Sequence, residues 1–278
     1  MNYKVQDSMK MEWTVLAEDI RELLGLKGNA VAITYAMHSP SGARHSKHRV
    51  CDAILMASHG DTLDLTINTC ACPGGTWHLG LTAYPTGQKD RVAKDFLVNR
   101  ERIYSSTTVC QKARGHVLPP PLGLADHVVL SPMDEAEFCP DAVLFICNAE
   151  QACRLVTLDS FESGTAPRVQ MTGSTCYQAI TYPVVSGEMN VSLMDYTSRH
   201  IRGYEPDDLL VTIPYYRFVN LMRRIDKCAA GRSKMRIPQS VLVRLLAHYN
   251  MAVPFAIAYL KAEEWSKKYL KIFKEKDK

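Results

Sequence analysis

Cysteine is the residue type in this chain that is best suited to chemistry, and two of the nine cysteines open a compact motif. Cys70 and Cys72 begin a C-A-C-P-G-G sequence that ends at Gly75. Paired glycines release the backbone into conformations that other residues avoid, so amide groups can approach a buried ligand closely. Amides directed at thiolate or inorganic sulfur stabilise negative charge and tune a reduction potential. The motif therefore suits a metal cluster or a reactive thiolate, although it lacks the spacing of zinc ribbons, zinc fingers or ferredoxins.

The cysteine count argues against a disulfide framework. The number of cysteines is odd, and the chain of 278 residues begins without the apolar segment of a secretory signal. These features predict thiols that are free, metal-bound or catalytic. A free cysteine is otherwise most often a small buried hydrophobic residue. We assign that role to Cys139, Cys147 and Cys228.

Other polar residues offer less specific signals. His38, His45 and His48 lie in one basic loop, which suits either an anion site or a solvated loop. Asp195 and Arg199 predict either a structural ion pair or a site for a substrate carboxylate, and both interpretations stay open. The chain has no nucleophile elbow, P-loop or dinucleotide-binding fingerprint, so it gives no support to those enzyme classes.

The composition is that of an ordinary globular protein. Hydrophobic residues make up 46% of the chain and charged residues 22%, and the formal net charge is +4. A charge this small does not indicate a nucleic-acid partner. No apolar stretch approaches the roughly 18–20 residues that a membrane-spanning helix requires. We therefore expect a cytoplasmic protein with no nucleic-acid partner and no transmembrane segment.

The elements that must position the cysteines fall into two similar series, each of a strand, a helix, a second strand and a cysteine turn. The first series comprises a strand at 31–37, a helix at 50–59 and a strand at 62–67 before Cys70, and the second a strand at 143–147, a helix at 150–160 and a strand at 168–172 before Cys176. Each half then ends with a strand that meets a proline, at 127–132 and at 209–214.

The two series predict an internal duplication. In that interpretation Cys51 corresponds to Cys153, the turn at Cys70 corresponds to the turn at Cys176, and both turns face a common cleft. The alternative is chance, since many α+β proteins show some recurrence of strand, helix and strand.

The predicted fold class is α+β, with two similar strand–helix–strand lobes around a mixed sheet and helices at the C-terminus. We expect a first half at 1–138 with a helical insertion at 89–115, a second half at 139–228, and a helical extension at 229–278. The extension is rich in lysine, which suits a solvated face, a membrane surface or an acidic partner.

These motifs resemble those of the uncharacterised ArCR proteins, a family found mainly in archaea and anaerobic bacteria. The resemblance rests on residues 51–60, 72–75, 79–81, 148–152, 173–176, 192–199 and 213–214. It spans roughly residues 14 to 225 and implies a shared fold with little settled biochemistry. The cysteines that match the family pattern are Cys51, Cys72 and Cys176. Cys70 is additional, and Cys153 stands where an apolar residue is expected.

Together, the motif and the resemblance predict an iron–sulfur protein with one [4Fe-4S] cluster between the two lobes. The expected metal ligands are Cys51, Cys70, Cys72 and Cys176, with Gly74 and Gly75 beside the cofactor and Arg199 at a substrate. Three thiolates with one open iron are a further possibility. The expected role is redox chemistry or electron transfer in anaerobic metabolism, with a small molecule or a redox protein as partner. The rival predictions are a metal-free protein that binds a small anionic metabolite, and a structural zinc protein. The sequence leaves open whether the protein is an enzyme and what its oligomeric state is.

Overall fold

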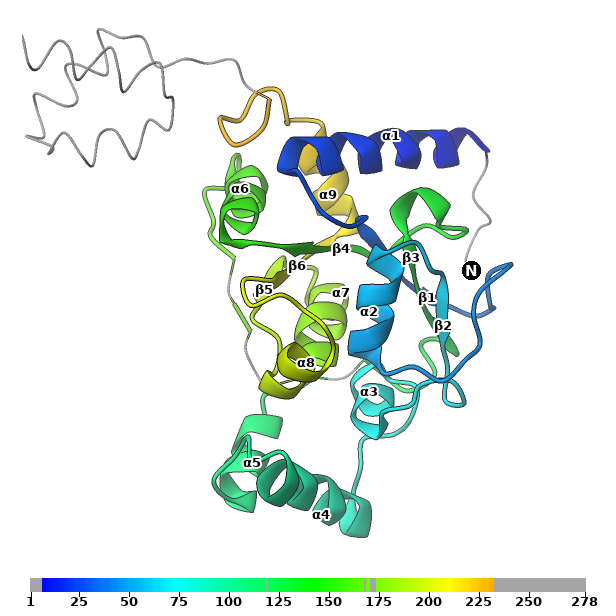
Figure 1. Ribbon diagram of the computed structural model, residues 1–278, viewed down its shortest axis with the longest axis vertical. Helices are drawn as coiled ribbons and strands as arrows, with labels where there is room; N and C mark the ends of the chain where they lie inside the picture. The colour runs from blue at the N-terminus through cyan, green and yellow to red at the C-terminus, as the bar shows by residue number, and fades with distance from the viewer. Residues whose placement is uncertain (1–6, 119, 168, 171–173, 233–278) are drawn as a thin grey trace, which may run out of the picture. The chain divides into compact units, whose positions relative to one another are not determined.

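The computed structural model describes residues 7–118, 120–167, 169–170 and 174–232 (Figure 1). The chain divides into two compact units, Met1–Ser233 and Lys234–Lys278, and every described residue belongs to the first. Almost all of the predicted C-terminal helical extension therefore lies outside the described residues.

A six-stranded sheet forms the centre of the first unit, with the strand order β2-β3-β1-β4-β6-β5. The strands are β1 (Val31–Ala36), β2 (Leu63–Leu65), β3 (His127–Pro132), β4 (Ala142–Cys147), β5 (Asn190–Ser192) and β6 (Leu209–Pro214). Each neighbouring pair is antiparallel. The fold is α+β as predicted, but the sheet is antiparallel throughout rather than mixed. Antiparallel neighbours do not need the helical crossover that parallel pairs require.

Helices cover both faces of the sheet (Figure 1). The described helical segments are α1 (Asp7–Leu24), α2 (Val50–Ser58), α3 (Pro73–His78), α4 (Gly87–Asp95), η1 (Phe96–Arg100), α5 (Thr107–Arg114), η2 (Met133–Glu135), α6 (Ala149–Ser160), η3 (Tyr177–Thr181), α7 (Tyr182–Ser186), α8 (Tyr196–Ile201) and α9 (Tyr215–Met222). The segments η1 and η3 are π-helical and η2 is a 3₁₀-helix. The insertion predicted at 89–115 contains α5 and all of α4 except its first two residues, and both helices lie at the end of the molecule away from α1.

The alternation of side chains along the central strands separates two cores. Val143 and Phe145 of β4 pack with helices α1, α6 and α9, whereas Leu144 packs on the opposite face with α2 and η3. Successive residues of a strand point to opposite faces, so a strand buried on both sides is apolar along its whole length. The cysteines of the candidate site lie on the α2 side, because Cys51, Cys70 and Cys176 belong to that second core.

The two halves of the sheet have matching strand orders and registers. Val31, the first residue of β1, pairs with Pro132, and Ala142, the first residue of β4, pairs with Pro214. The halves join where Ala32 pairs with its counterpart Val143. This arrangement is the one that a duplication would produce, but matching topology alone does not establish a duplication, which stays a prediction.

The predicted correspondence between the two cysteine turns is wrong. In the sheet, the counterpart of β2 is β5, at Asn190–Ser192, and not the segment predicted at 168–172. Val169 and Gln170 have no strand structure, and the other residues of that segment lie outside the described residues. Cys70 follows β2, whereas Cys176 precedes β5, because the second half inserts η3 and α7 between its long helix and its edge strand.

Candidate metal centre

Four of the nine cysteines lie in one region on the α2 side of the sheet. Cys51 is the second residue of α2, and Cys70 follows β2. Cys72 and Cys176 immediately precede α3 and η3, where each serves as the N-terminal cap residue. Cys51 and Cys70 are buried, and Cys72 and Cys176 are partly exposed. The structure thus brings together the four cysteines that the sequence predicted as metal ligands.

The thiols of Cys51, Cys70 and Cys72 act electrostatically on the thiol of Cys176. Burial raises the pKa of the Cys176 thiol well above its ordinary value, and the neighbouring thiols of Cys72, Cys51 and Cys70 raise it further. Burial also raises the pKa of Cys70 to about 11, with a smaller contribution in the same direction from Cys72 and Cys51. Such effects weaken with distance, so the thiols are neighbours in space although 125 residues separate the first from the last.

The loop before α2 holds the cysteine turn in place through its backbone. The amide of His48 donates to the carbonyl of Thr69 at 3.1 Å, and the amide of Ala71 donates to the carbonyl of His48 at 2.8 Å. This short parallel pairing lies beside β2, where Arg44 also forms a bridge with Leu63. The basic loop is therefore tied to the cysteine turn by its main chain.

The backbone of the two glycines in the motif is ordinary, and what distinguishes them is the lack of a side chain. Both lie inside helix α3, and neither has a positive φ. A Cβ on Gly75 would lie 2.8 Å from Val50 Cγ2 and 2.9 Å from Cys70 Sγ, closer than real Cβ atoms approach. A Cβ on Gly74 would lie 3.7 Å from Cys72 Sγ, an ordinary contact. The expectation of special backbone freedom is wrong for both, and Gly75 instead lets α3 pack directly against the Cys70 thiol.

Asp195 joins the Cys176 segment to helix α8. Its carboxylate accepts hydrogen bonds from the amide and the hydroxyl of Thr175, at 3.2 and 2.6 Å. The same carboxylate caps α8 by accepting from the amide and the hydroxyl of Ser198, at 2.7 and 2.8 Å. The Ser198 hydroxyl also contacts the Cys51 thiol, and this contact lowers the pKa of that thiol against the larger effect of burial. Asp195 is thus a positioning residue for two of the four cysteines.

Arg199 has a structural environment that the sequence did not predict. Its guanidinium donates to the main-chain carbonyls of Leu193, Glu205, Pro206 and Asp208. These bonds use most of its donors to hold the loop before β6. A role in binding substrate stays a prediction that these contacts do not favour, and we leave Arg199 out of the site.

The other five cysteines are dispersed. Cys147 and Cys228 are buried in the core on the opposite face of the sheet, as predicted. Cys139 is exposed, so the prediction that it is buried is wrong. Cys153 lies exposed on α6, and Cys110 is buried on α5. This scatter contrasts with the gathering of the four cysteines around α3.

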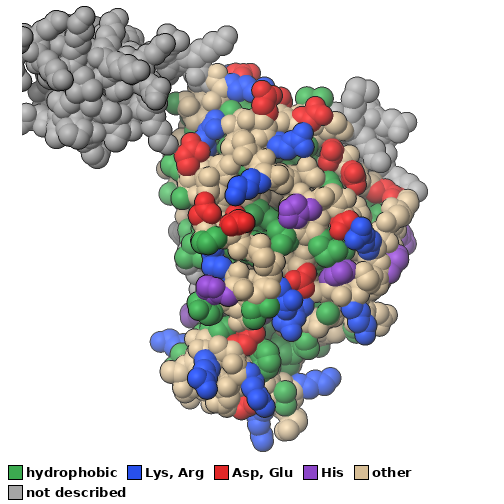
Figure 2. Space-filling view, in the orientation of Figure 1, with side chains coloured by type: hydrophobic (Ala, Val, Ile, Leu, Met, Phe, Trp, Pro, Cys, Tyr) green, Lys and Arg blue, Asp and Glu red, His purple; other side chains and the backbone are tan. Residues whose placement is uncertain are grey.

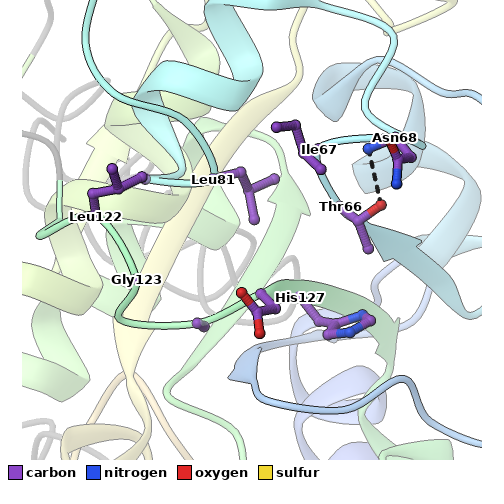
Figure 3. A pocket seen from close by; sticks show the side chains of 10 residues that line it. Thr66, Ile67, Asn68, Leu81, Leu122, Gly123 and His127 are labelled. Carbon is purple, nitrogen blue, oxygen red and sulfur yellow. Dashed lines mark hydrogen bonds between the residues drawn. The ribbon is translucent and has the colours of Figure 1, made fainter.

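A pocket of about 460 Å³ lies beside the cysteine turn (Figure 3). It is lined by residues 66–68 of that turn, by Gly80 and Leu81 after α3, and by residues 122–123 and 125–127 before β3. His127 at its edge donates from Nδ1 to the buried carboxylate of Asp64 at 2.9 Å. None of the four thiols lines this pocket.

The part of the chain that the structure describes has no ready-made site for a single metal ion. In the described ranges, no group of three or more His, Cys, Asp or Glu side chains is arranged to hold one metal ion. The site is therefore described as a group of four neighbouring thiols, two of them buried and two partly exposed. Among the described helices, none is both long and apolar enough to cross a membrane.

The sequence matches one protein family over most of its length. The family described as uncharacterised ArCR matches residues 19–224, which is more than half of the chain. The chain belongs to the ArCR family. The uncharacterized protein MJ0308 of Methanocaldococcus jannaschii is 24% identical over 223 residues, which cover 76% of this chain and 92% of that protein. No solved structure matches the chain. All four thiols lie within the part of the chain that the family covers.

Proposed function

We propose that Cys51, Cys70, Cys72 and Cys176 bind one [4Fe-4S] cluster and that the protein has a redox or electron-transfer role in anaerobic metabolism. The observation that carries the proposal is that Cys51, Cys70 and Cys72, from two other chain segments, lie close enough to Cys176 to act electrostatically on its thiol. Cysteines that serve only as apolar filler have no reason to gather, and the other five in this chain are dispersed.

The type and number of the donors are the first argument for a cluster. Four thiols from three chain segments match the four-thiolate ligand set of a [4Fe-4S] cluster. A structural zinc ion can also be bound by four thiolates. A structural zinc protein therefore stays the rival proposal.

The protonation of the thiols is the second argument. Burial raises the pKa values of Cys51, Cys70 and Cys176, so all three are neutral thiols at neutral pH when no cation is present. Metal ligation requires thiolates, and nearby iron supplies the positive charge that stabilises them. Loading of the site therefore releases protons and is favoured as the pH rises. When bound, the cluster would supply one-electron redox chemistry.

The residues around the thiols have definite tasks in this proposal. Asp195 fixes Thr175 and Ser198, and through them the positions of Cys176 and Cys51. The Tyr204 hydroxyl donates to the carbonyl of Cys51 at 2.7 Å and thereby fixes the start of α2. Such outer contacts orient ligands and tune the metal they hold. Reduced thiols favour a cytoplasmic location, and the partner would be a small molecule or a redox protein.

The test is anaerobic purification of the full chain, followed by iron and acid-labile sulfide analysis and visible absorption spectroscopy. We expect iron and sulfide in equal amounts and broad visible absorption. Cys72→Ser and Cys176→Ser should each strongly reduce the iron content. Cys228→Ser and Cys153→Ser, which change cysteines outside the group, should leave it unchanged.

Two outcomes would overturn the proposal. Full iron loading in both the Cys72 and the Cys176 variants would remove these residues from the ligand set. Stoichiometric zinc without sulfide would establish the structural zinc protein, and a colourless protein free of metal after anaerobic reconstitution would leave the metabolite-binding alternative.

A further inference from the structure

Two buried side-chain atoms in the described part of the chain have no hydrogen-bond partner, and both belong to one neighbourhood. They are Nδ1 of His78, on α3, and Nη2 of Arg114, on α5. Both side chains pack against Tyr84: the two ring centroids of His78 and Tyr84 lie 6.0 Å apart, and Arg114 Cζ lies 5.0 Å from the Tyr84 centroid. Buried polar atoms almost always have a hydrogen-bond partner. These two atoms without one, called the orphan atoms, therefore require an explanation.

The Arg114 guanidinium has one buried donor nitrogen, Nη2, without an acceptor. Its side chain is only 8% exposed, and Nη1 donates to Asp90 at 2.5 Å. Nε donates to the Tyr84 hydroxyl at 3.4 Å, and the indole of Trp77 lies under the guanidinium at 5.8 Å. A guanidinium does not lose its proton, so the N–H groups at Nη2 remain donors at every accessible pH. Whatever completes this group must accept hydrogen bonds.

His78 supplies a second polar atom beside the first. Burial lowers the pKa of His78 to about 4, the charge of Arg114 lowers it further, and the Asp195 carboxylate opposes both effects. The imidazole is therefore neutral at neutral pH and carries one N–H group, which can reside at Nδ1. The ring of Tyr177, next to Cys176, lies 6.1 Å from the His78 ring. The rings of Tyr84 and Tyr177 therefore both pack beside the imidazole of His78.

The position of the pair connects it to the cysteine site. His78 and Cys72 lie at opposite ends of the same short helix, α3. The Asp195 carboxylate acts electrostatically both on His78 and on the Cys176 thiol. His78 therefore shares a charged neighbour, Asp195, with the Cys176 thiol.

The end of the molecule that α4 and α5 form, to which Arg114 belongs, carries an excess of positive charge. The segment 87–114 carries seven Lys and Arg side chains against three Asp and Glu, which accounts for the whole formal net charge of +4. Figure 2 shows Lys and Arg side chains gathered over the end of the molecule that α4 and α5 form. A local excess of one charge raises the local concentration of ligands of the opposite charge.

We propose that His78 and Arg114 form a subsite for the carboxylate group of a small organic acid, next to the cysteine site. One guanidinium nitrogen and one imidazole N–H offer two donors, which match the two oxygens of a carboxylate. Phosphate presents more oxygens and a higher charge than this donor set satisfies, and the Asp195 carboxylate near His78 repels a dianion more strongly than a monoanion. The assignment of this acid as substrate rests on the proposed redox function, but the binding itself does not.

The test is isothermal titration of the full-length protein with acetate, propionate and inorganic phosphate, each in the same buffer and at the same ionic strength. We expect saturable binding of the two carboxylates and weaker binding of phosphate. Arg114→Lys keeps the charge but removes the planar donor pair, and His78→Gln alters the other donor from a different helix. Each should weaken acetate binding at least about tenfold, the effect of losing one charge-assisted hydrogen bond.

The controls separate this inference from the iron–sulfur proposal. Arg91→Lys, at an exposed position of α4, should leave acetate binding unchanged. The Cys72→Ser protein, which should lack a cluster, should still bind acetate. If it binds acetate and wild-type protein contains no iron, the subsite stands and the cluster proposal fails. Three results would overturn the subsite: absence of saturable carboxylate binding, acetate binding by both subsite variants that is as tight as that of the wild type, or tighter binding of phosphate than of acetate.

Discussion

Replacement of Gly75 by alanine tests whether close packing at this glycine maintains the cysteine site. The added Cβ would lie 2.8 Å from Val50 Cγ2 and 2.9 Å from Cys70 Sγ. Val50 is fully buried and β-branched, so its methyl group has no alternative position of low energy. The Cys70 side chain can rotate, but it would then lose the contact of its thiol with the Cys72 carbonyl at 3.5 Å.

The expected magnitude combines two opposing effects. Overpacking of a well-filled core by one methyl group costs about 1–3 kcal/mol. Alanine in place of glycine inside a helix raises the free energy of unfolding by up to about 1 kcal/mol. We therefore expect Gly75→Ala to lower the free energy of unfolding by about 1–2 kcal/mol. Gly74→Ala is the matched control, because its Cβ meets only Cys72 Sγ at an ordinary 3.7 Å while the gain in helix propensity is the same.

Urea denaturation followed by circular dichroism measures the free energy of unfolding of the two variants. Iron analysis then shows whether the cysteine site of each variant still binds metal. Gly74→Ala should be as stable as the wild type or slightly more stable, with unchanged iron content. Gly75→Ala should unfold at lower urea concentration and lose iron if the cluster proposal holds. Equal stability of the two variants would refute the packing argument for Gly75.

Three further predictions concern stability. Asp195→Ala should lower the free energy of unfolding by about 2 kcal/mol, because it removes a helix cap and the bonds to Thr175, whereas Asp126→Ala at an exposed position should have little effect on urea denaturation. The pKa of Cys70 is raised to about 11 in the folded, metal-free protein. The protonated thiol therefore contributes about 2–3 kcal/mol to the free energy of unfolding, fully below about pH 9, and this contribution is lost as the pH rises through about 11. Urea midpoints measured across this range should fall less in Cys70→Ala than in the wild type. Arg199→Ala should lower the thermal unfolding midpoint by releasing the loop before β6 but leave acetate affinity unchanged, and a large loss of acetate affinity would restore Arg199 to the site.

The sequence predicted the central strands because their side chains follow a simple rule. Continuous apolar runs such as 143–147 are buried on both faces of a sheet, and sequence alone is sufficient to recognise them. The edge strand β5 could not be recognised in this way. Asn190 and Ser192 are buried there because both bond to Gln178 of η3, a tertiary contact that no local period reveals.

The candidate site was predictable in its residue types but not in its geometry. The cysteine motif and the family pattern were sufficient to select the four thiols that the structure brings together. The role of Asp195 depends on Thr175 and Ser198, whose proximity follows from the packing of α8 against the chain before η3. The orphan atoms of His78 and Arg114 depend on how α3 and α5 meet around Tyr84, and the sequence carries no signal for that arrangement.

The pairing of Ala32 with Val143 at the centre of the sheet has a consequence for how the chain can be divided. Since these two residues hold equivalent positions in β1 and β4, halves separated after a cut between β3 and β4 would each expose, besides the edge at β2 or β5, one further strand edge, that of β1 or β4. That edge is complementary in register to the other half and equally to a second copy of its own half. The intramolecular contact would thereby become a subunit interface, and assembly of the sheet would depend on protein concentration.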